Sequence, residues 1–192
     1  MINLMSLGEK ILAAIAANDK WLNSLLSSGR GGNFDNFFLW ITSFGSWPLI
    51  VSGAAILTFF VWLKKKEFYI VPFWLALGGA NLTSLFSKLY FARLRPLAPI
   101  YWENTYSFPS GHAINSLFLY GFAIYFLAGL TARRSQKILI GLAGILIILL
   151  IGFSRLYLGV HYLSDVISGY IIGALWLTAA INGVKLFSRP KK

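Results

Sequence analysis

The sequence predicts an all-α integral membrane protein, a bundle of five transmembrane helices, or of six if the N-terminal region holds another. Three observations carry this prediction. Of the 192 residues, 57% are hydrophobic and only 12% are charged, whereas about 25% of the residues of a typical soluble domain are charged. Long apolar segments recur along the chain. The basic residues fall in short clusters between these segments, as is typical of membrane proteins.

Five segments have about the length that a helix needs to cross the hydrocarbon core of a bilayer, roughly 20 residues. They are residues 44–63, 68–87, 113–132, 138–153 and 166–184, and residues 35–43 could lengthen the first of them.

The N-terminal residues, 1–35, differ from these spans. They contain LGEKILAAIAANDKWLNSLL, in which charged residues interrupt the apolar positions. We interpret this part as an amphipathic segment that lies at the membrane interface. The chain shows no internal repeat and no linker rich in Gly, Ser or Pro, so we expect residues 1–192 to form a single domain.

Basic clusters predict how the chain is oriented in the membrane. With five spans, the clusters that follow the first, third and last spans all emerge on one side, which the positive-inside rule makes cytoplasmic. The N-terminus, the loop 88–112 and the turn 154–165 then lie on the extracytoplasmic side. The cytoplasmic clusters are Lys64, Lys65 and Lys66, then Arg133, Arg134 and Lys137, and finally Lys185, Arg189, Lys191 and Lys192.

The net charge of +11, from 17 basic and 6 acidic residues, bears on the class of partner. In a soluble protein such an excess would suggest nucleic acid. Here the basic residues flank apolar segments, so we expect the bilayer and an anionic substrate as partners and no nucleic acid. The chain has no cysteine, which excludes disulfides, thiolate metal sites and a cysteine nucleophile.

The first motif on the extracytoplasmic side is KLYFARLRP, Lys88 to Pro96. Lys88 and Arg95 are seven residues apart, nearly two helical turns, so both cations can project from one helix face. Pro96 then ends the helix. An alternative interpretation is that the two cations only anchor the end of the second span at the interface.

The second motif is PSGH, Pro109 to His112, directly before the third span. A Ser-Gly turn that opens a helix presents free backbone N–H groups and the positive end of the helix dipole, which suits an anion. Alternatively, Ser110 is an ordinary N-cap and His112 a polar residue at the interface.

The third motif is SRLYLGVHYLSD, Ser154 to Asp165. His161 and Asp165 are four residues apart and would share one face of a helix. A carboxylate that accepts a hydrogen bond from one imidazole nitrogen fixes the tautomer and leaves the other nitrogen free to attack. Arg155 precedes His161 across a glycine that permits a turn. Alternatively, Asp165 merely caps the last span.

Together the motifs suit phosphoryl transfer, which depends on charge neutralisation and positioning around one nucleophile. We expect His161 to be the nucleophile, Asp165 to orient it and His112 to act as general acid. This route needs no metal and no cofactor, whereas a two-metal phosphatase needs clustered carboxylates, and those of this chain are scattered. The residues expected to bind the phosphate are Lys88, Arg95, Ser110, Gly111 and Arg155.

The patterns KxxxxxxRP, PSGH and SRxxxxxHxxxD resemble, in full and in order, the three-part signature of the type 2 phosphatidic acid phosphatase superfamily, which also includes vanadium haloperoxidases. The resemblance implies a helical membrane phosphatase that acts on lipid phosphates at the outer surface, with the same residues in the same roles. It also implies six spans, one more than the apolar segments counted here. Residues 1–60 carry none of the resemblance.

In its small size the chain resembles bacterial members of this superfamily. These members lie in the inner or plasma membrane and dephosphorylate undecaprenyl pyrophosphate, phosphatidylglycerol phosphate, phosphatidic acid or the 1-phosphate of lipid A. The sequence leaves these substrates open. Two other functions stay open as well: a phosphotransferase that passes the phosphoryl group to another lipid, and a non-enzymatic transporter or lipid-binding protein that uses the cations as an anion pocket.

Overall fold

The structure is a computed structural model that describes residues 7–188, without the side chains of residues 7–9, 11 and 12. This part of the chain forms helices and no strand, which confirms the all-α prediction. The helices are α1 (Leu7–Ser27), α2 (Phe34–Ser43), α3 (Trp47–Leu63), the 3₁₀ helix η1 (Glu67–Tyr69), α4 (Ile70–Phe91), α5 (Gly111–Ala128), α6 (Arg134–Tyr157) and α7 (Leu163–Phe187).

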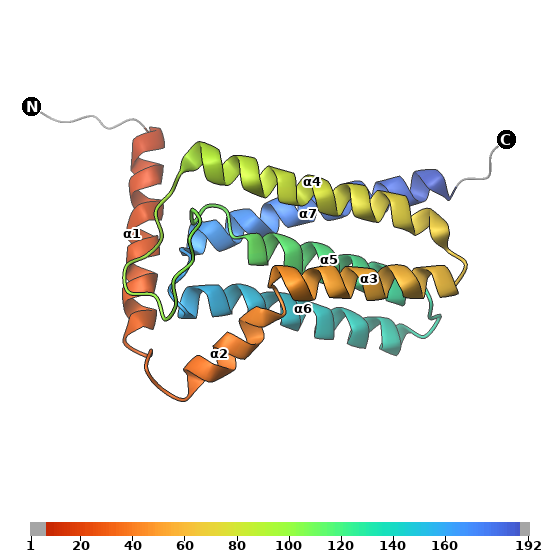
Figure 1. The fold of residues 1–192 in the computed structure, drawn as a ribbon, viewed down its shortest axis with the longest axis horizontal. Coiled ribbons are helices and arrows are strands. Elements are labelled where there is room, and N and C mark those ends of the chain that lie inside the picture. Colours follow the sequence, from red (N-terminus) through yellow and green to blue (C-terminus); the bar gives the residue numbers. More distant parts are fainter. Residues whose placement is uncertain (1–6, 189–192) are drawn as a thin grey trace, which may run out of the picture.

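Helices α3 to α7 run alongside one another as a bundle, and α1 stands across one end of it (Figure 1). Helix α5 is central and contacts α3, α4, α6 and α7. Its buried aromatic rings Phe118, Phe122 and Phe126 pack with Phe73 of α4 in the main apolar core.

Two glycines of α7 let this helix approach α5 closely. A Cβ atom at Gly169 would lie 2.7 Å from the carbonyl oxygen of Ser110, and one at Gly173 would lie 2.8 Å from that of Ile114. Small residues permit such backbone contact between membrane helices. The start of α7 is therefore held directly against the start of α5.

Four helical segments of the described residues are long and apolar enough to cross a membrane, and α2 with α3 gives a fifth if the pair is one span bent by 47°. This agrees with the predicted five spans. The first of the four is η1 and α4 taken together, and the other three are the helices α5, α6 and α7. Helix α1 is not among them, and it contacts α6 and α7.

Two predicted boundaries differ in the structure. Residues 35–43, which could lengthen the first span, form the separate helix α2, because the chain breaks at residues 44–46 and bends by 47° before α3. Pro48 in the first turn of α3 lacks the N–H that would continue a helix from α2, so a new helix begins there. The span 138–153 is also too short, since α6 continues through Ser154 and Arg155 to Tyr157.

The predicted grouping of charges matches the bundle. The α3–α4 turn with Lys64, the start of α6 after Arg133 and the last turn of α7 with Lys185 all lie at the end opposite α1 (Figure 1). The loop between α4 and α5 and the turn between α6 and α7 lie at the α1 end. Arg189, Lys191 and Lys192 lie outside the described residues.

Candidate active site

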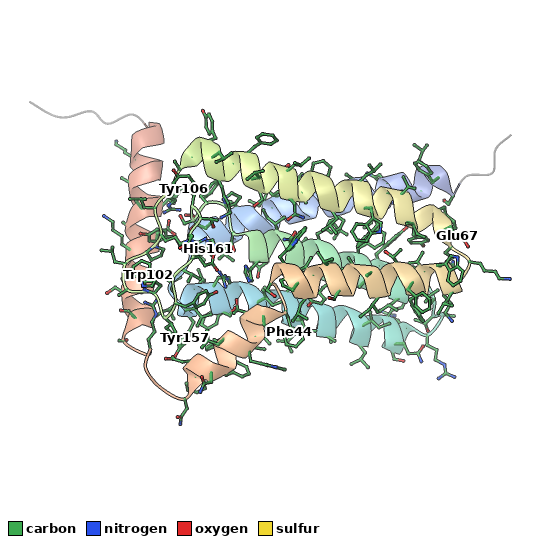
Figure 2. All side chains as sticks on the ribbon, viewed as in Figure 1. Phe44, Glu67, Trp102, Tyr106, Tyr157 and His161 are labelled. Carbon is green, nitrogen blue, oxygen red and sulfur yellow. The ribbon has the colours of Figure 1, made fainter. Side chains whose placement is uncertain are left out.

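Four helix ends meet beside α1 and bring the three sequence motifs together. The first motif ends α4, the second begins α5, and the third joins α6 to α7. His161 lies in this region, at the end of the bundle far from Glu67 (Figure 2). Residues 92–110, which connect α4 to α5, fold over the same end.

His161 and Asp165 are neighbours, but not as residues on one helix face. Helix α7 begins at Leu163, so His161 precedes the helix, and that part of the prediction was wrong. Asp165 Oδ2 accepts a hydrogen bond from the backbone N–H of Tyr162 at 2.9 Å and thereby caps α7. This cap turns the chain before the helix back toward Asp165. This leaves Nδ1 of His161 3.5 Å from Asp165 Oδ2, buried and with no hydrogen-bond partner.

The other ring nitrogen of His161, Nε2, lies 3.2 Å from Nη1 of Arg95. The same Nη1 donates to the carbonyl oxygen of Val160 at 2.7 Å, which fixes the guanidinium beside the ring. His161 is 2% exposed. Burial, and then the nearby charges of Arg155 and Arg95, lower the pKa of His161 well below its usual value. The imidazole is therefore neutral at physiological pH.

The turn that brings Arg155 toward His161 depends on Gly159, whose φ of +70° is the left-handed conformation that glycine adopts readily. Arg30, outside the three motifs, supports this turn from the N-terminal side. Its Nε donates to the carbonyl oxygen of Tyr157 at 2.6 Å.

Arg155 is completely buried at the end of α6. It donates to Thr42 Oγ1 at 2.6 Å, to the Tyr101 hydroxyl and to the Glu103 carboxylate. Its Nε has no hydrogen-bond partner. Because an unpaired buried charge is costly, these contacts account for how the bundle tolerates this cation.

Glu103 joins two of the predicted phosphate-binding arginines. One carboxylate oxygen contacts Arg155, and the other lies 2.6 Å from Nη2 of Arg95. Burial alone would raise the pKa of Glu103, but Arg155 and Arg95 outweigh it and lower this pKa to about 2. Glu103 is thus an ionised counter-charge at neutral pH. The sequence did not single out Glu103 as a site residue, because one acidic residue in an aromatic loop carries no distinguishing pattern.

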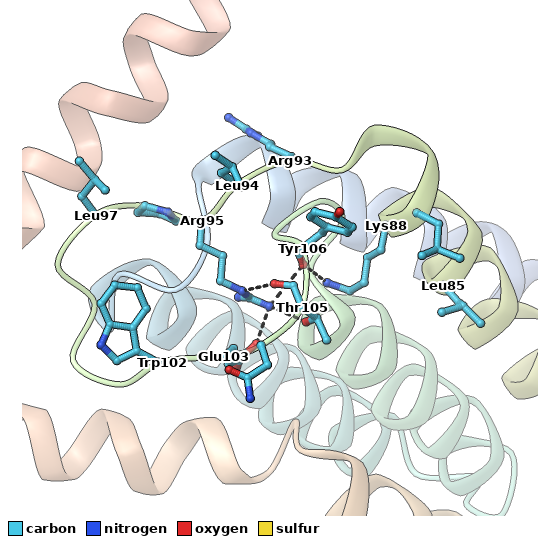
Figure 3. A pocket seen from close by; sticks show the side chains of 13 residues that line it. Leu85, Lys88, Arg93, Leu94, Arg95, Leu97, Trp102, Glu103, Thr105 and Tyr106 are labelled. Atoms are coloured by element: carbon cyan, nitrogen blue, oxygen red, sulfur yellow. Dashed lines mark hydrogen bonds and ion pairs between the residues drawn. The ribbon is translucent and has the colours of Figure 1, made fainter.

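Lys88 and Arg95 line an open pocket of about 640 Å³ (Figure 3). Lys88 Nζ donates to the carbonyl oxygen of Tyr106, which also accepts from Arg95 Nη2 at 3.3 Å. The rest of the wall is largely apolar: Leu85, Leu89, Leu94, Leu97 and Trp102. The pocket therefore combines cations with a surface that suits acyl or prenyl chains.

Of the two roles considered for the PSGH turn, the structure shows the helix cap. The N–H of Ser110 donates to the main-chain oxygen of Asp165 at 3.0 Å, which ties this turn to α7. Ser110 Oγ accepts from the N–H of Ala113 at 3.4 Å and caps α5, and Gly111 is the first residue of that helix. His112 follows in the first turn. Its ring packs against Gly45, where a Cβ atom would lie 2.8 Å from Cδ2.

A second network, also missed from the sequence, centres on Arg93. Its Nη1 lies 2.6 Å from Asp165 Oδ1 and its Nη2 lies 2.7 Å from Asp19 Oδ2. Asp19, only 2% exposed, also accepts the backbone N–H of Ser164 at 2.9 Å. Helix α1 therefore contributes a buried carboxylate to the first turn of α7.

Three acidic side chains at this end are thus paired with arginine: Asp19 and Asp165 with Arg93, and Glu103 with Arg95 and Arg155. Among the side chains that the structure describes, no three His, Cys, Asp or Glu residues are grouped as metal ligands would be.

Comparison with known proteins places this arrangement in context. The family model described as the PAP2 superfamily matches residues 69–189. Phosphatidylglycerophosphatase B of Bacillus subtilis (strain 168) is 31% identical over 166 residues, which cover 85% of this chain and 75% of that protein. An undecaprenyl-diphosphatase of Sulfolobus acidocaldarius is 25% identical over 164 residues, 82% of this chain and 73% of that protein.

Among solved structures, the crystal structure of a transmembrane PAP2-type phosphatidylglycerolphosphate phosphatase from Bacillus subtilis superposes with a TM-score of 0.80. Its sequence is 28% identical, and the match covers 93% of this chain and 90% of that one. The shared fold therefore includes the N-terminal part of the chain, where the three motifs are absent.

Proposed function

This chain belongs to the type 2 phosphatidic acid phosphatase (PAP2) superfamily, and we propose that it hydrolyses a phosphomonoester or a pyrophosphate on a membrane lipid through a phosphohistidine intermediate. The observation that carries the proposal is the position of His161. One nitrogen of its neutral ring faces Asp165 at 3.5 Å, and the other faces Arg95 at 3.2 Å. A nucleophile and a cation for the group it attacks are thus side by side.

In the first step, Nε2 of His161 attacks phosphorus, and the bond from phosphorus to the leaving oxygen breaks. His112 gives a proton to that oxygen, and the phosphoryl group remains on Nε2. Asp165, beside Nδ1, stabilises the positive charge that the ring gains. Charge on the phosphoryl oxygens is neutralised by Lys88 and Arg95, which line the pocket, and by three donors at the neighbouring helix ends that do not line it: Ser110, the Gly111 N–H and Arg155.

In the second step, water attacks the phosphohistidine and the bond between phosphorus and Nε2 breaks. His112 accepts the proton from water, inorganic phosphate leaves, and the neutral imidazole of His161 is restored. The protein's own cations carry the electrostatic work in both steps, so the route assigns no role to a metal ion.

The pocket supports a lipid as the substrate. Lys88 and Arg95 share it with several leucines and with Trp102, so a phosphate and the start of an apolar chain can both be accommodated. The named relatives act on phosphatidylglycerol phosphate and undecaprenyl diphosphate. We place this chain's substrate in the same class, with phosphatidic acid and lipid A 1-phosphate as further candidates.

We also propose that the site faces the extracytoplasmic side, because the basic clusters lie at the other end of the bundle. The absence of cysteine makes a direct test possible. In intact cells, a membrane-impermeant maleimide should label Asn104→Cys and leave Lys65→Cys unlabelled. The reverse pattern would overturn the assignment.

The function itself is tested by phosphate release from detergent-purified protein in the presence of EDTA. The substrate panel contains a pyrophosphate lipid, two glycerolipid monophosphates and lipid A. We expect release from at least one of them, abolished in His161→Ala and unchanged in Lys137→Ala, a charge change at the other end of the bundle.

Other outcomes of this panel contradict parts of the proposal. If the wild type binds these lipids and releases no phosphate, it is a binding protein. Transfer of the phosphoryl group to a second lipid would identify a phosphotransferase. Loss of wild-type activity on chelation alone would show that the reaction needs a metal.

A further inference from the structure

One short segment, Tyr101–Tyr106, already supplies partners to all three cations to which we assign phosphate binding. The Tyr106 carbonyl oxygen accepts from Lys88. Arg95 donates to the Thr105 carbonyl oxygen at 2.7 Å, and Arg155 contacts the Tyr101 hydroxyl and Glu103. Figure 3 shows Glu103, Thr105 and Tyr106 turned toward Lys88 and Arg95. The segment thus takes the donors that a phosphoryl group would need.

Within this segment, Glu103 has the chemistry of a phosphate substitute. Its two oxygens contact two different guanidinium groups, as two oxygens of a bound phosphoryl group would. A guanidinium donor that bonds to the carboxylate is unavailable to phosphate at the same time. Glu103 and a substrate phosphate therefore compete for Arg95 and Arg155.

The segment is also one that can be displaced. It belongs to the irregular connection between α4 and α5, and both Trp102 and Asn104, the neighbours of Glu103, are exposed. Tyr101 packs against a buried apolar cluster, but few apolar contacts need to break for residues 102–106 to move. Arg155 Nε, buried and unpaired, is a donor that Glu103 leaves unused and that a phosphoryl oxygen could take.

We propose that Glu103 is a specificity-determining residue whose carboxylate occupies Arg95 and Arg155 in the absence of substrate. A phosphomonoester dianion displaces this carboxylate, whereas a phosphodiester monoanion does not displace it. The inference rests on the proposed lipid phosphatase activity and adds a function for the loop. It explains how a strongly cationic pocket in a bilayer stays free of the phosphodiester headgroups that surround it at high concentration.

The discrimination follows from charge and from the number of oxygens. A phosphodiester exchanges one negative charge for another and offers two free oxygens, so it gains little over the tethered carboxylate. A terminal phosphoryl group carries about −1.5 to −2 charge at pH 7 and three free oxygens. The extra charge and the third oxygen can engage Lys88 or Arg155 Nε in addition to the donors that Glu103 releases.

The test measures hydrolysis of a fixed amount of phosphatidic acid in micelles of an uncharged detergent while phosphatidylglycerol, a phosphodiester lipid, is added. In Glu103→Gln we expect phosphatidylglycerol to inhibit at about tenfold lower concentration than in the wild type, the effect of roughly one charge-assisted hydrogen bond. The KM for phosphatidic acid should also fall, because no carboxylate has to be displaced.

Glu67→Gln is the matched control, since it removes the same charge at the opposite end of the bundle (Figure 2). It should leave inhibition by phosphatidylglycerol unchanged. If Glu103→Gln shows the wild-type inhibition curve as well, the proposal is wrong.

A second variant guards against a folding defect in Glu103→Gln. Tyr101→Phe removes a hydroxyl that contacts both Glu103 and Arg155 and keeps every charge. It should increase sensitivity to phosphatidylglycerol in the same direction but by a smaller factor. Wild-type sensitivity in this folded variant would count against the proposal.

A binding measurement separates this inference from the proposed activity. Thermal stabilisation of the purified protein by inorganic phosphate and by dimethyl phosphate requires no turnover. The wild type should be stabilised by inorganic phosphate alone, and Glu103→Gln by both. If no lipid is hydrolysed and this pattern holds, the proposed function fails and the role of Glu103 stands; equal stabilisation of the wild type by both anions overturns that role.

Discussion

Asp19 in α1 and Asp165 in α7 share the guanidinium group of Arg93, at 2.7 Å from Oδ2 of the first and 2.6 Å from Oδ1 of the second. The helix that lies across the end of the bundle is thereby linked to the carboxylate beside His161. Its tryptophan and leucine side chains Trp21 and Leu25 are exposed, whereas Asp19 is buried. Helix α1 thus directs Asp19 inward and presents large apolar side chains on its outer surface.

We expect Asp19→Asn to lower the free energy of unfolding by about 1–3 kcal/mol, because Arg93 and the first turn of α7 lose a buried charged partner. It should also lower kcat and leave KM nearly unchanged, since Asp19 does not line the pocket and reaches Asp165 through Arg93 and Ser164. Chemical denaturation in detergent and lipid hydrolysis measure the two effects. Lys20→Gln, an exposed neighbour on α1, is the control. A wild-type kcat in Asp19→Asn would show that the link has no catalytic role.

The low pKa of His161 predicts a pH dependence of stability. Below pH 6.5, the group's ordinary pKa, the unfolded chain binds a proton at this position that the folded protein does not bind until lower pH. The free energy of unfolding should therefore fall as pH drops from about 6.5 to 5, by up to about 1.4 kcal/mol per unit. His161→Gln should show a flatter profile in denaturation series. Parallel profiles would mean that the ring is not held neutral.

The absence of a side chain at Gly169 lets α7 approach α5 closely, and we expect activity to depend on this close approach. Gly169→Ala places a methyl group 2.7 Å from the Ser110 carbonyl oxygen, so the PSGH turn must shift. We expect a loss of about 1–3 kcal/mol in the free energy of unfolding and a lower kcat. Gly141→Ala is the control, because a Cβ atom at Gly141 meets nothing within 4 Å. Equal behaviour of the two variants would contradict the packing described here.

Arg155→Lys tests whether the buried cation must be a guanidinium. A lysine ammonium lacks the planar fork with which Arg155 contacts Thr42, Tyr101 and Glu103 together. We expect kcat to fall by about 10²–10³, the usual effect of losing one donor to transition-state charge. Single-turnover phosphate release measures this directly, with Arg133→Lys at the other end as control. A fall of less than twofold would remove Arg155 from the proposed mechanism.

The sequence predicted the later spans and the meeting of the three motifs, because both depend on patterns within the chain. Apolar length fixes a span, and helices that alternate direction place the end of α4, the start of α5 and the turn between α6 and α7 at one end, with Lys88, His112 and His161. The pairing of Glu103 with two arginines could not be predicted in this way. A lone carboxylate in a loop has no periodicity, and its partners are set by how the loop folds over the bundle.

Asp19 illustrates the same limit from another direction. In the sequence it interrupts an apolar pattern and suggests a polar face in contact with water, yet it is buried against α7. The proximity of His161 to Asp165 was predicted correctly, but from the wrong local structure. The spacing of the two residues suits one face of a helix, whereas the capping of α7 by Asp165 produces their contact.

All the side chains assigned to chemistry lie at one end of the bundle, and this has a consequence for the cell. An enzyme built in this way meets only the lipids of a single leaflet. A substrate synthesised in the opposite leaflet must first be flipped across the bilayer, and the dephosphorylated lipid must be flipped back before it can be reused. The proposed activity therefore depends on lipid transport between the two leaflets as well as on the site itself.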